Sequence, residues 1–163
     1  MQPTVPIVAS ARPVIVPPWM PIAFGELGEV EDVRRGKSNA RIEAYHEITF
    51  AGRAVDDVPW CASFVGWCLE SGGVRSTRSK SAASYAPWGV SCGYVFGALA
   101  VFAKSDPDAG GSGHTAFLLG VNGATAWILG GNQSNAVTIA SRSTRGMRTR
   151  WPSTVTLPDA VIR

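Results

Sequence analysis

The chain has 163 residues, of which 45% are hydrophobic and 17% are charged, and its formal net charge is +3. This length and apolar content exclude a globally disordered chain and indicate one domain that is large enough to bury a core. The modest positive charge is compatible with an anionic partner, although a surplus of this size does not identify one.

Residues 1–18 are predicted to form an extended arm, and residues 19–163 a single domain. Prolines recur through this arm and oppose any helix in it. No basic start is followed by an apolar run, and no apolar run reaches membrane-spanning length. The sequence therefore predicts neither a secretory signal nor a stable membrane insertion. The arm is either a flexible leader or an edge strand formed by Val14-Ile15-Val16.

Apolar residues at helical spacing predict helices in the first half of the domain, over residues 19–29, 38–47, 59–70 and 81–85. Ser38 or Asn39 is expected to cap the second helix, and Gly72-Gly73 to end the third.

The pattern changes from residue 98 onward. Short runs rich in Val, Ile, Leu, Phe and Trp predict strands over residues 99–103, 115–121, 124–129, 136–140 and 147–151, with a loop over 106–113. Helices followed by antiparallel strands predict an α+β fold.

Cys61 lies in the predicted first turn of the helix over residues 59–70. Asp57 is suited to cap this helix, and Pro59 suits an early helical position because its missing N–H needs no partner there. A thiol at a helix start faces free backbone N–H groups and the positive end of the helix dipole, and both favour the reactive thiolate. Cys61 is therefore a candidate nucleophile if a histidine can reach it.

The other two cysteines, Cys68 and Cys92, do not form a disulfide framework with Cys61. Cys61 and Cys68 are seven residues apart, which is about 10 Å along a helix and too far for a disulfide. Cys68 is therefore interpreted as a buried hydrophobic residue. There is no Cys-x-x-Cys pair and there are two histidines, so we predict no metal site and no cofactor.

The dipeptide Asn122-Gly123 is a strong signal for a two-residue hairpin turn. With this turn Val121 faces Ala124, and His114 lies opposite Gly131, so that the imidazole comes next to an amide side chain. Regular alternation places Gln133 on the face of His114. A bulge at Gly130-Gly131, or a one-residue change at the turn, would instead bring Asn132 to that face. Both amides remain candidates at this stage.

A thiol, an imidazole and an amide in this order support cysteine acyl transfer. Cys61 would attack a carbonyl carbon, and His114 would take the thiol proton and pass it to the leaving amine. The amide would hold the other ring nitrogen and fix the tautomer. The backbone N–H of Cys61 is a candidate donor to the oxyanion.

At these residues the chain resembles the NlpC/P60- and CHAP-like cysteine peptidoglycan hydrolases, and more narrowly a group of phage and prophage proteins among them. The resemblance covers roughly residues 22–152. The matching segments are Gly25–Glu29, Asn39–Tyr45, Val58–Leu69, Ser81–Gly89, Gly113-His114, Leu129–Gln133 and Arg150-Trp151-Pro152.

This resemblance implies a papain-like fold, with N-terminal helices and the cysteine helix packed on a C-terminal antiparallel sheet. It implies an amidase or endopeptidase that cuts an amide bond of peptidoglycan, as in a phage or prophage endolysin. The catalytic positions map to Cys61, His114 and Asn132.

Four further residues are candidates for contacts with substrate. Glu29 and Asp57 carry carboxylates suited to substrate amines, Trp60 has a ring suited to stacking, and Gln133 lies beside the catalytic amide. The structural alternatives are a helix cap for Asp57, a helix surface for Glu29 and a core position for Trp60.

The expected partner is peptidoglycan, with no nucleic acid, and the expected state is a monomer. The chain is expected to be made in the cytoplasm of the host and to act on the cell wall or in the periplasm after release or export. The alternatives are a secreted antibacterial effector toxin with the same chemistry, a non-catalytic cell-wall-binding module, and a different cysteine enzyme that acts on proteins.

Overall fold

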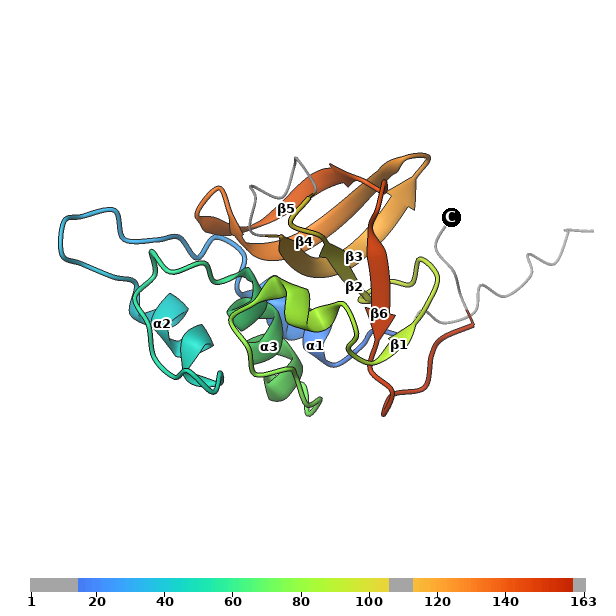
Figure 1. Cartoon of the computed structure of the whole chain (residues 1–163), viewed down its shortest axis with the longest axis horizontal. Coiled ribbons are helices and arrows are strands. Elements are labelled where there is room, and N and C mark those ends of the chain that lie inside the picture. The colour runs from blue at the N-terminus through green and yellow to red at the C-terminus, as the bar shows by residue number, and fades with distance from the viewer. Residues whose placement is uncertain (1–14, 106–112, 160–163) are drawn as a thin grey trace, which may run out of the picture.

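The computed structural model describes residues 15–105 and 113–159. In this part of the chain, short helices precede an antiparallel sheet, which confirms the predicted α+β class (Figure 1). The helical elements are α1 (Trp19–Gly25), α2 (Ala40–Glu47), α3 (Cys61–Ser71) and the 3-10 helix η1 (Ala82–Tyr85). The strands are β1 (Val90–Ser91), β2 (Leu99–Phe102), β3 (His114–Asn122), β4 (Thr125–Gln133), β5 (Ala136–Ser143) and β6 (Arg148–Trp151).

The helices form close to their predicted positions because local signals set their ends. The side chain of Asn39 caps α2 by accepting a hydrogen bond of 2.7 Å from the backbone N–H of Arg41. Helix α3 ends at Ser71 and is capped by Gly72, whose N–H bonds to the carbonyl of Cys68 at 3.0 Å. Helix α1 is shorter than predicted and ends at Gly25.

The strands form one sheet in the described residues, in the order β1-β6-β2-β3-β4-β5, and each neighbouring pair is antiparallel. Strand β1 was missed by the sequence analysis because its two residues are both exposed and carry no periodic pattern. The five longer strands confirm the predicted strand positions, although β4 and β5 extend further toward their C-terminal ends than predicted.

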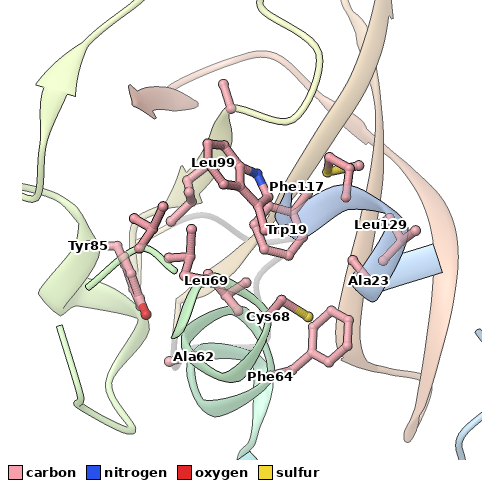
Figure 2. Close-up of a cluster of buried hydrophobic side chains, with 14 of the residues drawn as sticks. Trp19, Ala23, Ala62, Phe64, Cys68, Leu69, Tyr85, Leu99, Phe117 and Leu129 are labelled. Atoms are coloured by element: carbon pink, nitrogen blue, oxygen red, sulfur yellow. The ribbon is translucent and has the colours of Figure 1, made fainter. Parts of the chain in front are cut away.

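The helices pack on one face of the sheet, and the main core lies between the two layers (Figures 1 and 2). Figure 2 shows Phe64 and Leu69 of α3 near Phe117 of β3. Trp19 closes one end of this core: its indole N–H donates to the carbonyl of Gly97 at 2.8 Å, and its ring meets the Trp151 ring edge-on at 5.3 Å.

The other face of the sheet carries a second, smaller apolar cluster. It contains the buried residues Ala100, Phe102, Ala116, Leu118, Ala126 and Ile128. Since strand residues alternate between faces, His114 shares this face with Ala116, whereas Thr115 shares the helix-facing side with Phe117.

The hairpin between β3 and β4 forms, but its turn is shifted by one residue from the predicted position. Asn122 pairs with Thr125, so Gly123 and Ala124 make the turn, and Val121 faces Ala126 instead of Ala124. Gly123 has a φ of +57°, while Ala124 has no positive φ. A positive φ at the first central residue alone is typical of a type II′ turn, which favours glycine there. The predicted Asn-Gly turn would be type I′, with a positive φ at both central residues.

The described residues contain no helix long and apolar enough to cross a membrane. Residues 1–14 of the predicted arm and most of the predicted loop over 106–113 lie outside the described residues. Ile15 and Val16 are exposed and belong to no strand, so these two residues do not form the suggested edge strand.

Candidate active site

Cys61 is the first residue of α3, as the sequence predicted for a helix start. The helix cap is Trp60, which makes no capping hydrogen bond with its side chain. Asp57 is therefore not the cap. It lies in an exposed turn in which the N–H of Val58 bonds to the carbonyl of Val55 at 3.2 Å, and the helix begins after Pro59, at Cys61.

The sulfur of Cys61 lies in a tight environment between α3 and β3. The side chain is 7% exposed. Backbone N–H groups of Thr115, Ala62 and Cys61 itself point toward the sulfur, and each lowers the pKa of the thiol. Burial is the larger effect and raises this pKa above its ordinary value. The helix start thus supplies the predicted N–H donors, but their effect on the pKa of the thiol is smaller than the effect of burial.

His114 is the first residue of β3 and is 5% exposed. Its ring lies 6.3 Å from the ring of Phe102, measured between centroids. Burial, together with the positive charge of Arg142, lowers the pKa of His114 to about 4, although its hydrogen bond to Gln133 acts in the opposite direction. The imidazole is therefore neutral at pH 7.

Gln133 holds the imidazole of His114 and fixes its tautomer. The Nε2 group of Gln133 donates to the backbone carbonyl of Thr138 at 2.6 Å, so its Oε1 atom is the one that faces His114. The distance from this oxygen to Nε2 of His114 is 3.1 Å. Because an amide oxygen only accepts, Nε2 of His114 carries the proton, and Nδ1 is left as the basic nitrogen.

The family resemblance implies Asn132 as the third member of the site, whereas the amide that bonds to His114 in the structure is that of Gln133. The pairing of β4 with β5 shifts between Gly130 and Gln133, and Asn132 has a φ of +56°. This bulge turns Gln133 toward His114 while Asn132 stays half-buried. Among the described residues, the amide that bonds to His114 is that of Gln133.

The start of α3 contacts the start of β3 at Thr115, the residue that follows His114. The N–H of Thr115 points toward the sulfur, so the start of α3 touches the start of β3. Within the described part of the chain, no hydrogen bond joins this sulfur to the imidazole.

The structure gives three of the predicted substrate contacts different surroundings. Glu29 is half-buried and accepts a hydrogen bond of 3.2 Å from the side chain of Asn39. Trp60 is completely buried, and its indole N–H donates to Glu31 at 2.8 Å, so it has no free surface for stacking on a sugar. Asp57 is exposed.

Sequence reasoning missed two neighbours of the site, Thr115 and Arg142. Thr115 is fully buried, and its hydroxyl has no hydrogen-bond partner in the described structure. Arg142 lies on β5, two strands away from His114 in the sheet. No local pattern marks either residue. Thr115 contacts the sulfur because α3 packs on β3, and Arg142 belongs to β5, which is joined to β3 through β4. The described residues include no cluster of His, Cys, Asp and Glu that could hold a metal ion.

Comparisons with protein-family models, with curated proteins and with solved structures find no match to this chain.

Proposed function

We propose that this chain is a cysteine-dependent amidohydrolase that cleaves an amide bond of peptidoglycan, with Cys61 as nucleophile, His114 as general base and Gln133 as the residue that orients the imidazole. One observation carries this proposal. His114 forms a buried hydrogen bond of 3.1 Å with Gln133. The next residue in the chain is Thr115, and its N–H points at the sulfur of Cys61.

The reaction uses the neutral resting state of both groups. Nδ1 of His114 takes the proton of the thiol as the sulfur of Cys61 attacks the carbonyl carbon of the amide. The C–N bond breaks, the amine leaves with the proton from His114, and a thioester remains. Water then attacks the thioester with His114 as base, which releases a carboxylic acid and restores the thiol.

The peptidoglycan substrate and the papain-like fold rest on the resemblance to the NlpC/P60- and CHAP-like hydrolases. The arrangement of a cysteine at the start of a helix, packed against an antiparallel sheet that carries histidine and amide on neighbouring strands, agrees with this resemblance. A phage or prophage endolysin is the specific role we propose.

A second candidate is a non-catalytic cell-wall-binding module that keeps the same fold. The observation in its favour is the burial of Cys61, which leaves 7% of the side chain exposed. In this candidate the cysteine would be a packing residue, and its replacement by serine would leave the function of the chain unchanged.

Zymography on purified peptidoglycan tests the proposal. The wild-type chain is expected to clear the peptidoglycan, and Cys61→Ser is expected to clear none, because the serine hydroxyl is a much weaker nucleophile without a strong base. Mass spectrometry of the released fragments would then locate the bond that is cut.

Cys92→Ser is the matched control, since Cys92 is half-buried at the far edge of the sheet beside Thr149. This variant is expected to clear peptidoglycan like the wild type. Clearing by Cys61→Ser at the wild-type level would remove Cys61 from the mechanism, and no clearing by the wild type would favour the binding module.

A further inference from the structure

Thr115 buries a hydroxyl group that has no hydrogen-bond partner within the described part of the chain. Nearly all buried hydroxyls in proteins have a partner, because an unpaired one loses its hydrogen bonds to water and gains nothing in return. A valine would have almost the same shape without this cost, and it suits a strand as well as threonine does. The hydroxyl therefore lowers the stability of the resting protein, which indicates that another state of the protein uses it.

Thr115 lies directly against the proposed nucleophile. Its backbone N–H points toward the sulfur of Cys61. Its side chain lies on the helix-facing side of β3, together with that of Phe117. Helix α3 packs on this side of the strand, and Cys61 is the first residue of α3. The unpaired hydroxyl is therefore buried beside the atom whose charge changes in the proposed reaction.

The sulfur of Cys61 needs a further donor only after it has lost its proton. A neutral thiol is a weak acceptor, whereas a thiolate carries a full charge and accepts strong hydrogen bonds. The side chain of Cys61 is 7% exposed, so little water can reach a thiolate that forms there. The side chain of Thr115 can turn its O–H toward this charge without giving up an earlier bond.

We propose that the hydroxyl of Thr115 donates a hydrogen bond to the sulfur of Cys61 once the thiol proton has moved to Nδ1 of His114, and that Thr115 is therefore a catalytic residue. The hydroxyl keeps its own proton throughout. This bond is absent in the resting thiol and forms as the charge develops, so it stabilises the transition state and not the ground state. The catalytic role rests on the proposed hydrolase function, whereas the hydrogen bond itself does not require it.

The pH dependence of alkylation tests the hydrogen bond without any substrate. Iodoacetamide reacts with thiolates, so the pH midpoint of its reaction at Cys61 follows the ionisation of this thiol. Mass spectrometry of the peptide that carries Cys61 measures the reaction on the full chain. We expect the midpoint of Thr115→Val to lie about one pH unit above that of the wild type, because a bond to a charged group is lost. A change in accessibility alone would alter the rate of alkylation and not its midpoint.

Three further variants separate the hydroxyl from the rest of the side chain. Thr115→Ser keeps a hydroxyl and should keep the wild-type midpoint. Thr125→Val is the matched control, because it removes a hydroxyl from an exposed position at the start of β4, and it should also keep this midpoint. In urea denaturation Thr115→Val should be at least as stable as the wild type, because it removes an unpaired buried hydroxyl. If Thr115→Val fails to fold, Thr115→Ala takes its place and should show the higher midpoint.

Equal midpoints for Thr115→Val and the wild type would overturn the hydrogen bond, and so would an equally high midpoint for Thr125→Val. On soluble peptidoglycan fragments, Thr115→Val should lower kcat about tenfold and leave KM unchanged, because the bond is made only in the transition state. An unchanged kcat would overturn the catalytic role. A higher midpoint for Thr115→Val, together with no hydrolysis by the wild type, would confirm the hydrogen bond and refute the hydrolase function.

Discussion

The chemistry of single residues favours a site that rests uncharged. Burial raises the pKa of the Cys61 thiol and lowers the pKa of the His114 imidazole to about 4. A thiolate–imidazolium pair is therefore disfavoured before substrate binds. Gln133 matters in this state because it keeps the proton on Nε2 and leaves Nδ1 free to act as a base.

Replacing Gln133 by Ala should lower kcat/KM about tenfold or more, while Asn132→Ala should change it little. The lost buried hydrogen bond is worth roughly 1–2 kcal/mol, and 1.4 kcal/mol corresponds to a factor of ten in rate. Hydrolysis rates on soluble peptidoglycan fragments would give both values, with circular dichroism as the check on folding. A larger loss in Asn132→Ala than in Gln133→Ala would contradict the assignment made from the structure.

The sequence predicted the positions of Cys61 and His114 in the fold, although not for all the right reasons. Cys61 does begin a helix, but Asp57 does not cap that helix and Pro59 lies before it, while His114 does lie beside an amide, as the hairpin signal predicted. The choice between Asn132 and Gln133 depends on a positive φ and a bulge, which arise from the packing of β4 against its neighbours. Regular alternation pointed to Gln133, although the turn and the register from which it was derived were both shifted.

Strand β4 packs closely against the start of α3, and the geometry of the site depends on this contact. The contact is possible because Gly131 of β4 has no side chain. A Cβ atom at this position would lie 2.5 Å from the Trp60 ring and 2.7 Å from Cβ of Phe64, both closer than side chains tolerate. The sequence showed the two glycines before Asn132 but could not show which surface they touch, because that contact joins residues about 70 positions apart in the chain.

Gly131→Ala should destabilise the fold by about 1–3 kcal/mol, because the added methyl group forces Trp60 or Phe64 to move. Gly25→Ala is the control, since a Cβ atom at the end of α1 meets nothing within 4 Å. It should leave the stability unchanged or raise it slightly. Urea denaturation of the three proteins measures the difference, and equal midpoints for Gly131→Ala and the wild type would contradict the close approach.

The whole molecule carries two buried histidines, and both influence its stability. His46 on α2 is completely buried and lies 2.8 Å from the hydroxyl of Ser63 on α3, through Nδ1. Burial lowers its pKa, as it does for His114. His46 lies in the helix predicted over residues 38–47, but no sequence pattern showed which face of that helix is buried.

The free energy of unfolding should therefore fall as the pH falls from about 6.5 toward 4. In this range the unfolded chain binds protons on both histidines, whereas the folded chain keeps His114 neutral down to a pKa of about 4. Above pH 6.5 both histidines are neutral in the folded and the unfolded chain, so the free energy of unfolding has its full value there. The contribution of His114 amounts to about 3 kcal/mol, at roughly 1.4 kcal/mol for each pKa unit.

Urea titrations at several pH values measure this slope, and His114→Gln should reduce it because one of the two groups no longer titrates. A free energy of unfolding that is constant between pH 6.5 and 4.5 would show that the histidines are not held neutral by the fold.

We infer that the sulfur of Cys61, at the start of α3, carries out amide hydrolysis. The most direct measurement is the rate at which new amino groups appear in purified peptidoglycan, for the wild type and for Cys61→Ser at equal concentration. We predict steady release by the wild type and release at the level of the enzyme-free control for Cys61→Ser. Equal rates for the two proteins would show that Cys61 is not the nucleophile.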